Sequence, residues 1–525
     1  MDRRKFIAAG IGVPFAASAS ATPAVLAGEG INLPPPLSRE PRVRQAFERR
    51  QLAAKQSLDV RRKFLPIDAS VSRADRFSFS KGFLHNRLLG YDRTLQERLR
   101  AAIRTSDMAE IDAVYRSAVP IVNPVSGNSF LEAGRDSRQY ELIDPPDLTS
   151  SEFAWEAAEL CWAALCRDIP FSRYHESDLV GRAYAGLFGI ERSNEFAGSV
   201  FQPESRPTFS GPYVSQFLLR ETRLGGIPQV FRGIFAARDI DYMTDFDAFV
   251  RIQNGTRPEK KPVYDASRSF PATGRDLASL IHKDYPAQYF VHAAQQLFEL
   301  GSSALNEGNP YVGRRNQSAF ASFGLPHCFA LLNKAACQAL QVAWYLKWQI
   351  YNRLRPEEYF GLLHVSRDTD VGLPHPNEPN LALAMNEVNQ RYGSYLLPQA
   401  YPEGSPIHPS YPAGHAVAAG ACGTILKCFF RAETPFEMVY DVDPSGARLT
   451  DQPGGVTVGD EIDKLMWNVS FGRCFAGIHW RSDCEFGIRL GEEVANDLMH
   501  EMGLFQAERR EAMTYLSFDR HEVII

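Results

Sequence analysis

The helical spacing of apolar residues in three long segments is the feature that most constrains the fold. These segments cover residues 150–169, 287–305 and 331–354, and their apolar side chains recur at intervals of three and four residues. Runs that alternate apolar and polar residues, as half-buried strands do, are rare and short. Long loops rich in proline and glycine separate the helical segments. The sequence therefore predicts an all-α fold with a helical bundle core, long loops and little strand.

Length and composition predict an ordinary globular chain. Of the 525 residues, 44% are hydrophobic and 23% are charged. The formal net charge of -5 argues against a general nucleic-acid binder, which needs a basic face. The eight cysteines show no CxxC spacing of a zinc site, and their pairing as disulfides stays open. We expect one functional helical domain over residues 150–525, preceded by a linker and helical arm over residues 28–149.

Residues 1–27 resemble a twin-arginine export signal. Arg3 and Arg4 precede an apolar, Ala-rich stretch, and small residues near Ala27 offer a cleavage site. The alternative is a membrane anchor, but the stretch is short and is broken by Gly, Pro and Ser. We therefore expect an exported protein, periplasmic or secreted, without a membrane span in the mature chain.

The first candidate segment for chemistry contains Lys347 and Arg355. On a helix, eight residues at about 100° each bring Arg355 to within about 80° of Lys347 around the axis, so both cations can lean toward one side. Pro356 disfavours helical geometry in the residue before it and is expected to mark the helix end. Taken alone, the segment is better explained by a solvated Lys/Arg pair on an amphipathic helix.

The second segment, HPSYPAGHAVAAGA (408–421), places two histidines near a helix start. Its prolines hold the backbone extended before Gly414, and the small residues after His415 indicate a buried helix. A helix start with glycine offers main-chain N–H groups to an oxyanion, and the helix dipole reinforces them. His415 could exchange a proton with such a ligand. Two loop histidines satisfied by carbonyl groups are the alternative.

The third segment contains Arg473, His479 and Asp483 in the spacing R-x5-H-x3-D. If Gly477 turns the chain and a helix starts near His479, Asp483 can bind the far imidazole nitrogen. That contact would fix the tautomer and raise the basicity of the nitrogen that faces a ligand. Helix capping explains either residue alone. Jointly, two arginines, a lysine, a main-chain N–H and two histidines suit a tetrahedral oxyanion.

The three segments together resemble the vanadium-dependent haloperoxidases, within the type 2 phosphatidic acid phosphatase superfamily. The superfamily pattern is K-x6-RP, then PSGH, then SR-x5-H-x3-D. This chain has K-x7-RP, a spacing similar to that of the algal-type bromoperoxidases. The stretches AYPEGSPIHPSY (400–411), GACGTILKCFF (420–430) and GIHWRSD (477–483) strengthen the resemblance. It implies two four-helix bundles and a homo-oligomer.

The resemblance also implies vanadate as the cofactor. The groups implied to bind its oxygens are Lys347, Arg355, Arg473 and the Gly414 amide. His479 would be the metal ligand, with Asp483 behind it, and His415 would be the acid/base that deprotonates hydrogen peroxide. Lys347, His415 and His479 are the implied catalytic residues. His408 and Trp344 would line the halide pocket.

The implied reaction is the oxidation of bromide, and of iodide, by hydrogen peroxide. It yields hypohalous acid, which halogenates small organic acceptors. Halide preference, acceptor and oligomer size stay open. Two other functions suit the same residues: a phosphomonoesterase, with His479 as nucleophile and His415 protonating the leaving group, and a non-catalytic oxyanion-binding protein.

Two positions depart from the family pattern. Ala413 stands where the family has a serine that donates to vanadate, and Gly472 precedes Arg473 in place of a serine. Loss of one hydrogen-bond donor costs about 1–3 kcal/mol if nothing compensates for it. Neither change removes a cation or a histidine.

Overall fold

The computed structural model describes most of the chain from residue 93 onward. The described residues are 81, 93–189, 200–203, 209–366, 378–504, 506–508 and 512–525. The predicted export signal (1–27) lies outside them, as does most of the first part of the predicted arm. Among the described residues, no helix is both long and apolar enough to cross a membrane.

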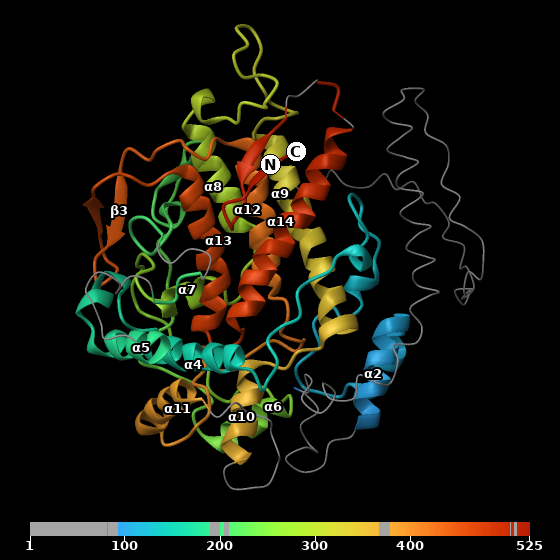
Figure 1. Cartoon of the computed structure of the whole chain (residues 1–525), viewed down its shortest axis with the longest axis vertical. Coiled ribbons are helices and arrows are strands. Elements are labelled where there is room, and N and C mark those ends of the chain that lie inside the picture. Colours follow the sequence, from blue (N-terminus) through green and yellow to red (C-terminus); the bar gives the residue numbers. More distant parts are fainter. Residues whose placement is uncertain are drawn as a thin grey trace, which may run out of the picture.

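Four helices pack together at the centre of the molecule (Figure 1). They are α9 (Leu325–Tyr345), α12 (Gly414–Phe429), α13 (Val458–Phe475) and α14 (Arg481–Gly503). Helix α12 is the innermost: it contacts each of the other three and is almost entirely buried. Glycines let α12 and α14 approach backbone to backbone. A Cβ on Gly420 would lie 2.0 Å from the Ile488 carbonyl oxygen, and one on Gly491 would lie 2.1 Å from that of Val417.

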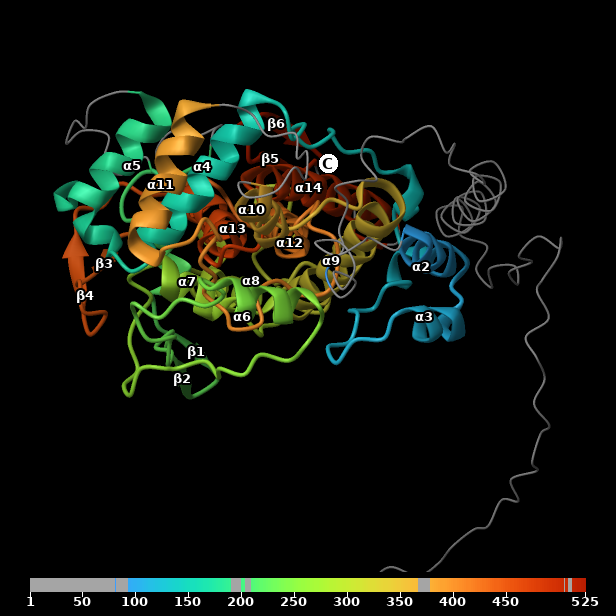
Figure 2. The same cartoon turned by 90° about the horizontal axis from the view of Figure 1, so that it is seen from below.

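A second group of helices lies against this centre. Helix α4 (Ser151–Cys166) contacts α5 (Asp178–Phe188), α11 (Pro379–Tyr392) and α13, and Figure 2 shows α11 beside α4. Helix α7 (Gly274–Leu280) packs on α13, and α8 (Gln288–Glu299) packs on α9. The other α-helices of the described residues are α2 (Arg93–Thr105), α3 (Met108–Val114), α6 (Phe246–Gln253) and α10 (Pro356–Ser366).

Strands are few and short in the described part of the chain. Three antiparallel pairs are formed: β1 (Thr222–Leu224) with β2 (Ile227–Gln229), β3 (Val439–Val442) with β4 (Leu449–Gln452), and β5 (Thr514–Leu516) with β6 (Glu522–Ile524). The predicted all-α class, with little strand, is confirmed. The three predicted helical segments correspond to α4, α8 and α9. All three helices end before the predicted boundaries, and α9 begins at Leu325, before the predicted start at residue 331.

The prediction that Lys347 and Arg355 share one helix is wrong. After α9 the chain continues as a π-helical turn (Leu346–Tyr351), which ends at Asn352 in the left-handed conformation, φ 46°. Pro356 opens α10 instead of closing α9. Proline suits the first position of a helix, because its missing N–H has no helical partner there. Lys347 therefore lies in the π turn, and Arg355 lies in the short segment before α10.

Candidate active site

The predicted site residues lie at helix ends that meet in the interior. They come from the π turn after α9, the segment before α10, the start of α12, the end of α13 and the start of α14. Direct contacts join Arg355 to His408 and His479, and His479 to Asp483. The charges of Lys347 and Arg473 also lower the pKa values of His415 and His479, which places them close by. More than a hundred residues of chain separate some of the partners, 124 between Arg355 and His479, so the meeting point depends on helix packing.

Arg355 occupies the middle of the site. Its side chain is fully buried, and its Nε donates to the carbonyl oxygen of His408 at 2.9 Å. One terminal nitrogen donates to the Ile478 carbonyl at 2.8 Å and lies 2.9 Å from Nε2 of His479. The other lies 3.0 Å from Nδ1 of His408. Arg355 thus connects both histidines, and burial lowers its pKa.

Lys347 lies beside Arg355 and is also fully buried. Its Nζ donates to the carbonyl oxygens of Pro409 and Ser410 at 2.8 and 2.6 Å. Burial, and then the neighbouring charge of Arg355, lower the pKa of Lys347 well below its usual value. An ammonium group has three donors, so two carbonyl bonds leave one N–H for a ligand.

Arg473, the third cation, is the least satisfied of the set. One terminal nitrogen donates to the Ile281 carbonyl at 2.5 Å, and the guanidinium carbon lies 5.8 Å from the ring centroid of Tyr401. The Nε atom is buried and has no hydrogen-bond partner among the described residues. A buried donor without a partner is costly, which makes this nitrogen a place for an acceptor from a ligand.

His479 and Asp483 form the contact that their spacing predicts. Gly477 turns the chain with φ 83°, α14 begins at Arg481, and Nδ1 of His479 lies 2.8 Å from Oδ2 of Asp483. The carboxylate fixes Nδ1 as the protonated nitrogen, so the lone pair of Nε2 faces Arg355. Burial, and then Arg355, hold the pKa of His479 well below its usual value, which keeps the ring neutral.

His415 has a carboxylate partner that sequence reasoning missed. Its Nε2 lies 2.8 Å from Oδ1 of Asp284, in the loop between α7 and α8, and 18% of the His415 side chain is exposed. Burial and Arg473 lower the pKa of His415, against the opposing effect of Asp284. Asp284 is 131 positions away in the chain and stands in no motif, so nothing in the sequence marks it.

The two residues predicted to line a halide pocket are neighbours. The rings of Trp344 and His408 have centroids 4.7 Å apart at 42°. Trp344 is fixed by a 2.9 Å bond from its Nε1 to the Val122 carbonyl. Burial, and then the charge of Arg355, lower the pKa of His408 well below its usual value. A neutral imidazole and an indole therefore border the cations.

Ala413 is the N-cap residue of α12 and provides no capping side chain. The nearby Ser410 does not stand in for a serine there, since its hydroxyl donates to Asp483 Oδ2 and lies 3.4 Å from His479 Nδ1, behind the imidazole. At Gly414, an added Cβ would lie 3.0 Å from Cζ3 of Trp344. The helix start is therefore closely packed and short of one side-chain donor.

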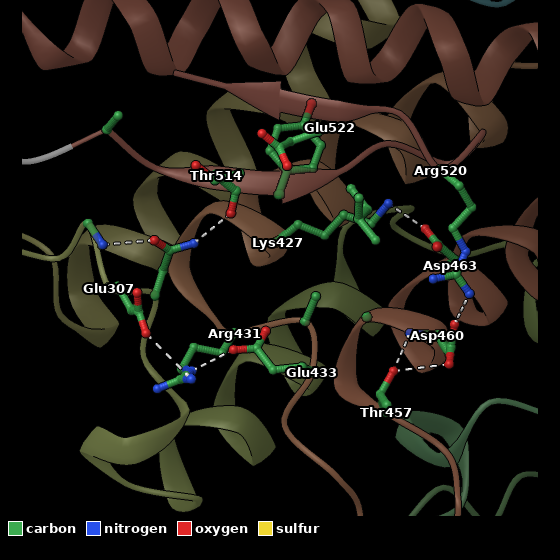
Figure 3. A pocket seen from close by; sticks show the side chains of 17 residues that line it. Glu307, Lys427, Arg431, Glu433, Thr457, Asp460, Asp463, Thr514, Arg520 and Glu522 are labelled. Atoms are coloured by element: carbon green, nitrogen blue, oxygen red, sulfur yellow. Dashed lines mark hydrogen bonds and ion pairs between the residues drawn. The ribbon is translucent and has the colours of Figure 1, made fainter.

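A separate cavity of about 550 Å³ lies at the opposite ends of α12 and α13 (Figure 3). Lys427, which lines this cavity, lies twelve positions after His415 in α12, about 18 Å along the helix axis. Its charged side chains pair with one another: Lys427 with Asp463, and Arg520 with Asp460. This cavity is distinct from the cluster of Lys347, Arg355, Arg473 and the histidines.

Known proteins resemble this chain in sequence and in structure. Residues 327–506 match the family model described as the VCPO second helical-bundle domain. The chain is 34% identical over 410 residues to a vanadium-dependent bromoperoxidase of Ascophyllum nodosum, covering 73% of each chain. It is 30% identical over 461 residues to that of Corallina pilulifera, covering 74% of this chain and 76% of the relative.

A solved structure agrees over nearly the whole length. It is the homohexameric structure of the second vanadate-dependent bromoperoxidase from Ascophyllum nodosum, with a TM-score of 0.82 and 26% identity. The match covers 97% of this chain and 95% of that one. Because the sequence identity extends over almost three quarters of both chains, the protein belongs to the vanadium-dependent haloperoxidases of the bromoperoxidase type.

Proposed function

We propose that the protein is a vanadate-dependent haloperoxidase. It oxidises bromide, and iodide, with hydrogen peroxide to hypohalous acid, which halogenates small organic acceptors. The observation that carries the proposal is the gathering of three buried cations around a neutral His479 held by Asp483. Membership of the bromoperoxidase family supports the same reaction.

The residues present fit an oxyanion that carries several charges. Lys347, Arg355 and Arg473 place three positive charges in the interior, and each of the first two depresses the pKa of its neighbours. Arg473 also has a buried Nε without a partner among the described residues. A phosphate-like anion would neutralise these charges and accept from this nitrogen.

Each residue has a definite task in the proposed enzyme. Lys347, Arg355, Arg473 and the Gly414 amide would hold the oxygens of vanadate, and Nε2 of His479 would be the protein ligand to vanadium. When bound, vanadate supplies a Lewis-acid centre that activates hydrogen peroxide for attack by the halide. The buried cations lie ready to stabilise negative charge that develops on the transferred oxygen.

His415 is the proposed base for hydrogen peroxide. Asp284 occupies its Nε2, so Nδ1 is the nitrogen that we propose takes the proton. The lowered pKa keeps the ring neutral near pH 7, as a base requires. His408 and Trp344 would border the halide, beside Arg355.

Replacement of His479 and His415 by alanine, each alone, tests this division of tasks. We expect His479→Ala to lose bound vanadium and bromide oxidation together, measured by elemental analysis after dialysis and by bromination of a phenol dye. His415→Ala should keep the vanadium and lose most of the turnover. Full activity in the His479 variant would contradict the proposal and favour a non-catalytic role for this histidine.

We also propose that the chain forms a homo-oligomer and is exported. The homohexameric relative supports the first point, and the Arg3–Arg4 pair supports the second. Replacing Arg3 and Arg4 by lysine should retain the protein inside a bacterial host that exports the wild type. Equal export of both forms would contradict the twin-arginine assignment.

A further inference from the structure

A buried ionic chain leads away from His479 toward α4. Asp483 uses Oδ2 for His479, at 2.8 Å, and its other oxygen, Oδ1, accepts from Arg353 at 2.9 Å. The same Arg353 nitrogen also donates to the Ser482 hydroxyl at 2.8 Å. Oδ2 also accepts from the Ser410 hydroxyl and the Trp480 backbone N–H. Arg353 is therefore the side-chain partner of the other oxygen, Oδ1, and it holds the carboxylate from the side away from the imidazole.

Arg353 is in turn held by Glu156 of α4. The second terminal nitrogen of Arg353 donates to Oε2 of Glu156 at 3.1 Å, and Oε1 of Glu156 accepts from the Ser482 backbone N–H at 2.6 Å. The side chains of Arg353, Glu156 and Asp483 are 5%, 6% and 0% exposed. The guanidinium carbon also lies 5.3 Å from the ring centroid of Trp480, which adjoins His479.

We propose that Glu156 and Arg353 are positioning residues for His479. Glu156 fixes the guanidinium, the guanidinium fixes Asp483 through Oδ1, and Oδ2 thereby stays on Nδ1 of the imidazole. Nε2 then keeps its direction into the cationic site. This inference rests on the proposed function, in which Nε2 binds the oxyanion, and neither positioning residue touches the ligand.

Position, more than stability, is what such a pair supplies. A buried ion pair recovers little more than the cost of taking its charges out of water, so it adds little net stability. It does impose one geometry, because a guanidinium with two occupied edges cannot turn without losing bonds to Asp483, Ser482 or Glu156. Groups that orient the ligands of a metal typically change metal affinity by 10–100-fold when they are removed.

The chain offers a matched control one turn further along α4. Glu159 is fully buried like Glu156, and its Oε2 accepts from Nε of Arg481 at 2.8 Å. Arg481 bonds Glu485 at 2.9 Å, where Arg353 bonds Asp483. The two carboxylates share helix, burial and an arginine partner. They differ in one respect: Arg353 donates to Asp483, the carboxylate that binds His479, and Arg481 does not.

The test compares Glu156→Gln with Glu159→Gln in the full-length chain. Two quantities are measured: the dissociation constant of vanadate, by equilibrium dialysis with elemental analysis, and the Tm of the vanadate-free protein. We expect Glu156→Gln to weaken vanadate binding about tenfold and Glu159→Gln to leave it within about twofold, at similar losses of Tm. Arg353→Lys should behave like Glu156→Gln, since one ammonium cannot replace both edges, and Arg481→Lys should not.

The failures of the two proposals are distinguishable. The positioning role alone would be overturned if Glu156→Gln bound vanadate as tightly as wild type. It would also be overturned if Glu159→Gln weakened vanadate binding as much as Glu156→Gln does. A wild-type chain that binds no vanadate would overturn the proposed function and this inference with it.

Discussion

Single residues at the start of α12 and beside it set the strength of the site. Ala413 caps α12 without a side-chain acceptor, and its amide donates to the Asp483 carbonyl at 2.9 Å. The backbone there is therefore tied to the segment that carries His479. A serine at this position could cap the helix, donate to an oxyanion, or alternate between the two.

Ala413→Ser should raise vanadate affinity, because it restores a donor beside the Gly414 amide. We expect the dissociation constant of vanadate to fall about fivefold to tenfold, which corresponds to about 1 kcal/mol for one hydrogen bond. Equilibrium dialysis measures it. A higher Tm of the vanadate-free variant without any gain in affinity would show that the new hydroxyl caps α12 and does not serve the ligand.

Asp284 offers a test of the proposed base. Its charge raises the pKa of His415, so Asp284→Asn should lower that pKa further. Because the neutral imidazole is the active form, the acid limb of the kcat/KM profile for bromide oxidation should move to lower pH. The maximum rate should fall about tenfold or more as the ring loses its orientation. An unmoved acid limb would exclude His415 as the group that titrates there.

The sequence could predict the residues that bear the charge but not those that hold them in place. Lys347, Arg355, Arg473 and His479 stand at spacings that identify a motif, and Asp483 follows one helical turn after His479. Asp284 and Glu156 are ordinary carboxylates in distant segments. Glu156 accepts a hydrogen bond from the backbone N–H of Ser482, which is 326 positions away in the chain. Their roles arise only when the helices pack.

Among the elements, the end of α9 was the hardest to predict. Apolar residues continue at helical spacing beyond Tyr345, so periodicity extends the helix to residue 354. The π turn and the left-handed Asn352 interrupt it instead, and they separate Lys347 from Arg355. A π turn keeps the backbone helical, so its side-chain spacing differs too little from that of an α-helix to be recognised in a sequence.

The stability of the protein should depend on pH through Glu492, which lies near the end of α12 that is remote from the active site. This residue is buried on α14, its Oε1 accepts from the Phe518 backbone N–H at 2.8 Å, and Lys427 lies 3.5 Å away. Burial raises its pKa from 4.5 to about 7. The folded state therefore favours the protonated form of Glu492. The stability that this preference contributes is complete below pH 4.5 and is lost as the pH rises through 7.

Glu492→Gln should remove this pH dependence, since an amide stays neutral. As the pH rises from 5 to 7.5, wild type should lose up to about 3 kcal/mol of stability that the variant keeps. The Tm of the variant should therefore rise relative to that of wild type. Thermal unfolding of the vanadate-free proteins at both pH values measures it. Parallel Tm curves for the two proteins would show that Glu492 ionises at its ordinary pKa.

At the scale of the whole molecule, the all-α class followed from periodicity alone, whereas the assembly did not. Burial patterns in one chain do not distinguish a free surface from one that a second copy covers. Among the described residues, several large apolar side chains are exposed, Ile227 and Phe320 at 63% and 73%. The solved relative that matches 97% of this chain is homohexameric.

The proposed assembly predicts that the full-length protein elutes as a homo-oligomer. Light scattering coupled to size-exclusion chromatography measures its mass against the 58.8 kDa of one full chain. A multiple of the monomer mass at micromolar concentration is expected. A monomer under the same conditions would contradict the proposed assembly while leaving the site intact.

Bromide oxidation with and without vanadate tests the central claim most directly. The full-length protein, stripped of vanadium, is assayed with bromide, hydrogen peroxide and a phenol dye, and then again after addition of vanadate. We predict no bromination before the addition, bromination after it, and suppression by excess phosphate, which competes for Lys347, Arg355 and Arg473. Hydrolysis of a phenyl phosphate by the vanadate-free protein, with no bromination under either condition, would contradict the account and identify a phosphomonoesterase.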